Sequence, residues 1–362
     1  MGRILGLQDV EAAIRGGSVF AAGGGGWVEH GRMLGTTAVN IGRPELVAIE
    51  EVPDDAYIAT AAAIGAPAGT TQWQMLGVDY VKAVELLEEA LGAPLYGLMI
   101  GQNGSSSTMN AWLPSAMLGT KVVDAVGDIR AHPTGDMGSI GMASSPEPTI
   151  QVAVGGHRDS NSYLELVVRG ATAKVSPVLR KAADMSGGFI ASCRNPLRAS
   201  YVRRHAALGG ISRALALGQA IMAAEPKGAR AIIEAILDAT SGGLLGEGRV
   251  TKKAVAYRND AFDIGTIAIR SGSRDLVLHV MNEYMAVSDG EGVRLATFPD
   301  VIATLGVDGR PVSVGQIREG DELAVLHIDK SRVPLSSSVK DPAVYPVVEA
   351  ALGIPIARYA LA

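Results

Sequence analysis

Four consecutive glycines, Gly23, Gly24, Gly25 and Gly26, end a short apolar run that begins at Ser18. A segment with few helix-breaking residues follows at once, over residues 27–40, and is predicted to be a helix. A strand, a glycine turn and a helix in this order bring bare backbone and unpaired N–H groups close to a ligand. The positive end of such a helix suits a carboxylate, a phosphate or a polarised ring carbonyl. The same pattern also fits a tight turn without a ligand, because its spacing matches neither the dinucleotide fingerprint nor a P-loop.

The composition limits the function classes. The chain has 362 residues, of which 48% are apolar and 19% charged, and this is typical of a globular enzyme with room for two domains. A net charge of −5 without a basic tract argues against nucleic acid as the partner. No uncharged apolar run reaches the roughly 20 residues of a membrane-spanning helix. Polar residues interrupt the N-terminal segment early, so we expect no signal peptide and a cytoplasmic location. We also expect a homo-oligomer.

The pattern of periodic segments predicts an α/β domain over residues 1–155 and a β-rich domain over residues 156–362. In the first, strands at 46–52, 57–67, 94–101 and 120–127 alternate with helices at 7–16, 78–92 and 111–119. This alternation favours a mainly parallel sheet with helices on its faces, whose ligands lie beyond the carboxyl ends of the strands. In the second, short strands surround a helical pair at 204–225 and 227–240, and residues 343–356 are predicted to form a closing helix and strand.

A dense polar cluster follows the buried strand at 120–127. Asp124 is expected at the strand end as a base, His132 as a proton relay and Arg130 as a clamp for an anionic substrate group. The alternative is an Asp–Arg pair that braces a loop. No cofactor is required by the pattern, but it is compatible with a divalent metal, in which case His30, Asp124 and His132 are the candidate ligands.

A second cluster lies on a strand predicted over residues 279–284. Strand alternation places Asn282 and Tyr284 on one face and Glu283 and His279 on the other. Asn282 and Glu283 stand among apolar neighbours, and burying them is costly unless they are paired or face a cavity. The alternative is a polar strand face in water.

The single cysteine, Cys193, excludes an internal disulfide and any multi-cysteine metal site. The neighbouring Arg194 would favour a reactive thiolate, whereas burial would make the thiol inert, and the inert alternative is the commoner one. No serine stands in a nucleophile-elbow context.

The order of motifs resembles the S-methyl thiohydantoin desulfurase family, which is often found beside hydantoinases and oxoprolinases. The resemblance runs nearly end to end. It rests on GGGG (23–26), VVDAVGDIRAHP (122–133), GGISRALALGQAI (209–221), AIIEAILDATSGGLLGEGRV (231–250), VMNEYMAVSDG (280–290) and the long stretch at 297–326. The chain departs from the family pattern at acidic positions: it has GTTQWQ at 69–74, IGQNG at 100–104 and Thr134 where the family has glutamate-containing segments.

The resemblance implies an N-terminal α/β domain, a β-rich domain with helices, and hydrolytic removal of sulfur from a five-membered thiohydantoin ring. In the resulting hypothesis, Asp124, through His132, activates water, and Glu283 closes the pocket from the second domain. The residues expected to hold the cyclic amide or thioamide are Gly23, Gly24, Gly25, Gly26, Asn103, Arg130 and Asn282. Two alternatives stay open: a non-catalytic partner subunit of a hydantoinase or oxoprolinase assembly, and a zinc-dependent hydrolase.

Overall fold

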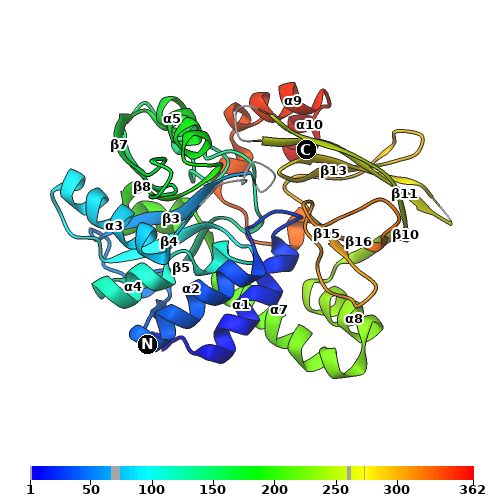
Figure 1. The fold of residues 1–362 in the computed structure, drawn as a ribbon, viewed down its shortest axis with the longest axis horizontal. Coiled ribbons are helices and arrows are strands. Elements are labelled where there is room, and N and C mark those ends of the chain that lie inside the picture. Colours follow the sequence, from blue (N-terminus) through cyan, green and yellow to red (C-terminus); the bar gives the residue numbers. More distant parts are fainter. Residues whose placement is uncertain (1, 67–73, 259–261, 273) are drawn as a thin grey trace.

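The computed structural model describes residues 2–66, 74–258, 262–272 and 274–362, and it has two lobes, each built around one β-sheet (Figure 1). Among these residues the first sheet has nine strands in the order β1-β2-β5-β4-β3-β8-β6-β7, with β9 paired to β5. Its strands are β1 (Arg3–Ile4), β2 (Glu45–Val47), β3 (Tyr57–Gly65), β4 (Gly97–Gln102), β5 (Lys121–Asp128), β6 (Thr149–Gly155), β7 (Leu164–Gly170), β8 (Phe189–Arg198) and β9 (Ala207–Leu208).

The centre of this sheet is parallel and its flanks are antiparallel. Strands β2, β5, β4 and β3 run in the same direction, whereas β8, β6 and β7 continue the sheet with alternating direction. The predicted fold class is therefore confirmed, and the first sheet extends past residue 155 to include β7, β8 and β9. Long-range antiparallel pairing of this kind leaves no local sequence signal, because each strand shows only its own alternation.

Helices cover both faces of the first sheet. Helices α1 (Leu7–Phe20), α2 (Val28–Ile41), α3 (Gly77–Leu91) and α4 (Trp112–Leu118) share one apolar core with β3, β4 and β5. On the opposite face, α5 (Thr172–Met185) packs on β6 and β8, and α6 (Ala199–His205) packs near β5. Helix α3 ends as predicted at Gly92, which adopts the left-handed conformation with φ of 73°.

The second sheet is antiparallel throughout. Among the described residues it has seven strands in the order β14-β13-β12-β11-β10-β16-β15. They are β10 (Gly243–Arg258), β11 (Phe262–Ser271), β12 (Leu276–Met281), β13 (Glu283–Asp289), β14 (Arg294–Thr297), β15 (Val301–Leu305) and β16 (Glu322–Ile328). Helices α7 (Gly210–Ala224) and α8 (Ala229–Thr240) are the predicted helical pair and pack against β15 and β16, while α9 (Pro346–Leu352) and α10 (Ala357–Ala360) cover β11 to β13.

Helices α1 and α7 join the two lobes by direct backbone contact (Figure 1). A Cβ atom built on Gly16 of α1 would overlap the carbonyl oxygen of Ala214, and one built on Gly218 of α7 would overlap that of Ala12. Only glycine at both positions lets the helix axes approach this closely. The glycine block that follows α1 is thereby held at the junction of the lobes.

Three local predictions were wrong. Residues 18–20 continue helix α1, so the glycine block follows a helix rather than a strand, because a short apolar run fits both periods. Asn282 forms a turn between β12 and β13, and its φ is 58°. Residues 279–284 are therefore not one alternating strand. The segment 343–356 contains α9 but no strand, since its last residues lead into α10.

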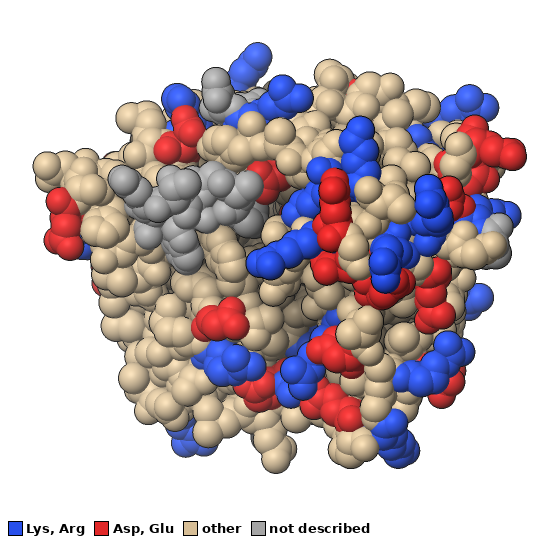
Figure 2. Space-filling view, turned by 45° about the vertical axis from the view of Figure 1, so that its right-hand side comes forward, with Lys and Arg blue, Asp and Glu red and all other residues tan. Residues whose placement is uncertain are grey.

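The surface in Figure 2 carries interspersed basic and acidic side chains, most densely on its right-hand part. No broad basic area of described residues is visible on this face, and this agrees with the net charge of −5. Within the described ranges, every helix is too short or too polar to cross a lipid bilayer.

Candidate functional site

A pocket lies where the carboxyl ends of β3 and β4 meet the turn between β12 and β13. It encloses about 770 Å³ of non-protein space, including its open mouth. This is the edge of a parallel sheet where α/β proteins bind ligands, and the second lobe completes its wall. The polar side chains that line it are Gln102, Ser107, Asn110, His132, Thr134, Ser176, Arg180, Arg194, Asn282 and Glu283.

Gly24, Gly25 and Gly26 form one wall of this pocket and are locked against the loop that follows β4. The carbonyl oxygen of Gly25 accepts hydrogen bonds from the backbone N–H groups of Ser106 (3.0 Å) and Ser107 (3.3 Å). Gly25 has φ of 76°, and a Cβ there would lie 2.6 Å from the Cα of Gly104. The glycine block therefore brings backbone to the pocket wall. Its packing against the loop after β4 is by itself a sufficient reason for glycine at these positions. Gly23 lies outside the pocket lining and contacts Tyr284 instead.

Glu283 is the carboxylic acid of the pocket. Its carboxyl group packs against Gly24, and its buried Oε2 atom has no hydrogen-bond partner among the residues that the structure describes. Burial raises its pKa to about 8, although the charges of Arg130 and Arg180 oppose the shift. At neutral pH the group is consequently a protonated carboxyl, which can donate a proton or a hydrogen bond.

Asn282 fixes the position of Glu283. The backbone N–H of Asn282 donates to the carbonyl of Asp263 (2.8 Å), and its side-chain oxygen accepts from the backbone N–H of Asp263 (2.8 Å). Asparagine tolerates the left-handed conformation that this turn requires. Asn282 and Glu283 thus both reach the pocket, through a turn and not through strand alternation.

His132 is a neutral ring that braces the pocket loop. Burial lowers its pKa to about 4. Its Nδ1 atom lies 2.9 Å from the carbonyl oxygen of Thr134, and its Nε2 atom lies 3.3 Å from that of Gly101. Its backbone N–H donates to Oε1 of Gln102 (3.0 Å). A neutral imidazole has one N–H group, so it donates to one of these two carbonyl oxygens, and that hydrogen bond holds the ring against the loop.

Two arginines, which we had not predicted as site residues, supply positive charge. Arg180 donates from Nη2 to the carbonyl of Pro133 (2.5 Å), and its guanidinium lies over the ring of Phe262. Arg194 is 5% exposed, and its Nε atom has no hydrogen-bond partner among the described residues. A buried guanidinium with an unused N–H group can bind an oxygen atom of a ligand. The sequence pointed to Arg194 only as the neighbour of Cys193. The Cys193 thiol is buried, and burial raises its pKa, so the cysteine fits the inert alternative and not the reactive one.

Asp124 lies in the middle of β5, and not at the strand end as expected. Its Oδ1 atom accepts hydrogen bonds from the backbone N–H groups of Ile211 (2.9 Å) and Ser212 (3.1 Å), in the first turn of α7. The carboxylate therefore satisfies a helix N-terminus and does not line the pocket.

Asn103 and Arg130 are also buried outside the pocket lining. The side-chain amide of Asn103 donates to the carbonyls of Ile129 (3.0 Å) and Gly210 (3.1 Å). Arg130 donates from Nη1 to the carbonyls of Tyr284 (2.9 Å) and Asp300 (3.0 Å), which joins the two lobes behind Glu283. Arg130 is thus the loop brace of our alternative interpretation, although its partners are carbonyl oxygens and not an aspartate side chain.

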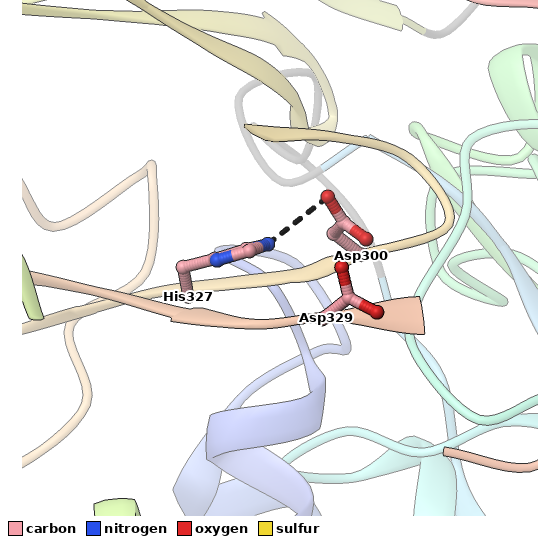
Figure 3. A group of neighbouring side chains, drawn as sticks. All are labelled: Asp300, His327 and Asp329. Carbon is pink, nitrogen blue, oxygen red and sulfur yellow. Dashed lines mark ion pairs between the residues drawn. The ribbon is translucent and has the colours of Figure 1, made fainter. Parts of the chain in front are cut away.

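The residues considered as metal ligands do not converge. His30 is buried with Nε2 3.5 Å from the hydroxyl of Tyr80, while Asp124 and His132 make the separate contacts described above. Among the described residues, the group with metal-ligand spacing is instead Asp300, His327 and Asp329 (Figure 3). Of the segments that depart from the family pattern, residues 69–73 lie outside the described part of the chain, whereas Gln102 and Thr134 line the pocket.

Comparisons with known proteins cover nearly the whole chain. A family model described as "S-Me-THD-like, N-terminal domain" matches residues 8–163, and one described as "S-Me-THD-like, C-terminal domain" matches residues 171–335. The crystal structure of a protein from Chromobacterium violaceum has a TM-score of 0.74 and 24% sequence identity, over 97% of this chain and 96% of that chain. This likeness shows a shared fold. No curated protein matches the chain.

Proposed function

Because the chain belongs to the S-Me-THD-like family, that of the S-methyl thiohydantoin desulfurases, we propose that it hydrolyses a carbon–sulfur bond on a hydantoin-type ring. The substrate carries a methylthio group on the ring carbon between the two nitrogens. Water adds to this carbon, the carbon–sulfur bond breaks, and the sulfur leaves as a thiol with one proton. In the net balance the ring nitrogen gains the second proton and the ring carbon keeps the oxygen as a carbonyl, which gives a hydantoin.

The observation that carries this proposal is the buried carboxyl of Glu283 at the pocket wall, where burial raises its pKa to about 8. Proton donation from Glu283 to the ring nitrogen makes the neighbouring carbon more electrophilic. The resulting carboxylate then accepts a proton from the attacking water and passes it to the leaving sulfur. The proton of the hydroxyl group left on the ring carbon returns to the carboxylate as the carbonyl forms, and this restores the protonated acid. One carboxyl group with a raised pKa can thus serve as acid and then as base, and no second titratable group is required.

Arg194 and the glycine wall supply the binding part of the proposal. Arg194 is buried and positively charged, and its Nε–H group is unused within the described part of the chain, so it suits the ring carbonyl oxygen or an anionic ring substituent. The bare backbone of Gly24, Gly25 and Gly26 leaves room for a flat ring against the opposite wall. The mouth of the pocket admits water.

The experiment is a turnover assay with an S-methyl thiohydantoin, in which the released thiol and the hydantoin product are both quantified. We expect turnover by the parent protein and a loss of about 10²-fold or more in kcat for Glu283→Gln. Glu291→Gln is the matched control, because Glu291 is exposed in the turn after β13 and should leave kcat unchanged. Saturable binding of the ring without thiol release by the parent protein would contradict catalysis and favour a non-catalytic partner subunit.

A further inference from the structure

We propose that Asp300, His327 and Asp329 bind a divalent transition-metal ion, Zn²⁺ or Mn²⁺, which clamps the end of the β15–β16 strand pair. The three side chains point toward one another, and their potential ligand atoms all lie within 4.8 Å of each other (Figure 3). They lie outside the pocket described above. This proposal is independent of the proposed function.

Strand geometry brings the three residues together. Val301 pairs with Ile328 in the antiparallel β15–β16 ladder, so Asp300 and Asp329 stand opposite each other at its end. His327 lies two residues before Asp329 and therefore shares its face of the sheet. The backbone of the β15–β16 pair thus brings together one histidine of β16 and the two aspartates that flank the end of the ladder.

The electrostatics of this arrangement favour a cation. Two carboxylates directly opposite each other in a sheet repel when nothing lies between them. The Nε2 atom of His327 lies 3.0 Å from Oδ2 of Asp300, yet it is inaccessible to solvent and makes no hydrogen bond of normal geometry. A buried ring nitrogen and two facing carboxylates are the donor atoms that a metal ion would satisfy together.

The existing hydrogen bonds leave coordination sites free. The Oδ1 atom of Asp300 accepts from the backbone N–H of Lys330 (2.9 Å), and its Oδ2 atom accepts from that of Thr297 (3.2 Å). The Oδ1 atom of Asp329 accepts from the backbone N–H of Ser331 (2.8 Å). Each carboxylate oxygen has two lone pairs, so these bonds fix the carboxylates and keep one lone pair per oxygen available. Such support of metal ligands by backbone donors is usual in metal sites.

The donor set selects the class of ion. One imidazole nitrogen with two carboxylates suits Zn²⁺ or Mn²⁺, at about 2.0–2.2 Å from each ligand atom after small side-chain rotations. Mg²⁺ prefers an all-oxygen octahedral shell and is the weaker candidate. Asp329 is exposed, so water can complete the coordination.

The test uses the full chain after chelator treatment, with Zn²⁺, Mn²⁺ or Mg²⁺ added back alone. We expect about one equivalent of Zn²⁺ or Mn²⁺ by elemental analysis after desalting, and a higher melting temperature than in the chelated protein. Asp329→Asn should weaken metal affinity about tenfold or more, while its side chain still accepts from Ser331. His327→Gln should do the same through a second ligand.

Asp341→Asn is the matched control, because Asp341 also caps a short 3-10 helix, through Oδ1 and the backbone N–H of Ala343 (2.9 Å), but lies outside the cluster. It should keep the metal content and the melting shift of the parent. Absence of bound metal in the parent, or equal affinity in the parent, Asp329→Asn and His327→Gln, would overturn the proposal.

Discussion

The carboxyl group of Glu283 occupies the space that a side chain at Gly24 would need: a Cβ built on Gly24 would overlap Oε1 of Glu283. One residue comes from the turn after α1 and the other from the start of β13, so this contact joins the two lobes at the pocket. It also explains why Glu283 is shielded from water, and hence why its pKa is raised.

Gly24→Ala should displace the Glu283 carboxyl and lower turnover of the S-methyl thiohydantoin at least tenfold. Gly24 does not have a positive φ, so the substitution adds no backbone strain and acts through this contact. The measurement is kcat together with the melting temperature. Gly243→Ala is the control, because a Cβ there meets no atom within 4 Å. Equal turnover in both variants would show that Glu283 moves without consequence.

The arrangement around this contact was only partly predictable from the sequence. The α/β and β-rich lobes could be predicted because helical and strand periods are local properties of the chain. Three residues of the glycine block line the pocket, but the helix that precedes the block was mistaken for a strand, since an apolar run of a few residues suits both structures. The pairing of β3 with β8, which brings Arg194 to the pocket, depends on residues more than 100 positions apart and leaves no local trace.

The site residues show the same limit. Asn282 and Glu283 could be singled out because polar residues among apolar neighbours need a partner or a cavity. Asp124 was singled out because it belongs to a dense polar cluster after a predicted strand, yet its partner is the N-terminus of α7, which begins 86 positions later. A local pattern identifies a carboxylate that can accept hydrogen bonds, but the partner that supplies them is set by the tertiary fold.

The activity should depend on pH through Glu283. Its protonated form is the proton donor, and its pKa is raised to about 8. The rate should therefore be level between pH 6 and about 7, and then fall by about tenfold per pH unit above 8. The profile of kcat against pH for the parent protein is the measurement. A rate that rises through pH 8 would instead require the carboxylate as the group that begins the reaction.

Arg194→Met should raise KM for the ring substrate more than it lowers kcat. The guanidinium is buried at the pocket with an unused Nε–H group, and methionine keeps its apolar bulk while removing the donors. Loss of one charge-assisted hydrogen bond predicts about a tenfold or larger change in KM. Arg318→Met, at an exposed arginine, is the comparison. An unchanged KM would place the ligand away from Arg194.

Asp128→Asn should remove part of the pH dependence of stability. Asp128 is fully buried at the end of β5, and its two oxygens have no hydrogen-bond partner of normal geometry among the described residues. Burial raises its pKa from 3.8 to about 7, against the opposing charge of Arg130. The unfolded chain releases this proton near pH 4 and the folded chain near pH 7, so folding stability due to this group falls as pH rises between these values. The asparagine variant should therefore gain stability relative to the parent from pH 4 to pH 7, measured by urea unfolding. A constant difference across this range would mean that Asp128 is already ionised in the folded protein.

Asp124→Ala separates a structural carboxylate from a catalytic one. The Oδ1 atom of Asp124 accepts from Ile211 and Ser212 at the start of α7, a role equivalent to that of a helix N-cap. Removing it should lower the free energy of unfolding by about 1 kcal/mol, in the range of about 0.5–2 kcal/mol measured for lost N-caps. Since Asp124 does not line the pocket, kcat should stay within about twofold of the parent value when the variant is assayed well below its melting temperature. Asp124→Asn supplies the internal comparison, because its side-chain oxygen can still accept from the helix and should recover most of the stability. A loss of kcat in both variants, with stability preserved in Asp124→Asn, would return Asp124 to the reaction and require water to reach it by a route other than the pocket.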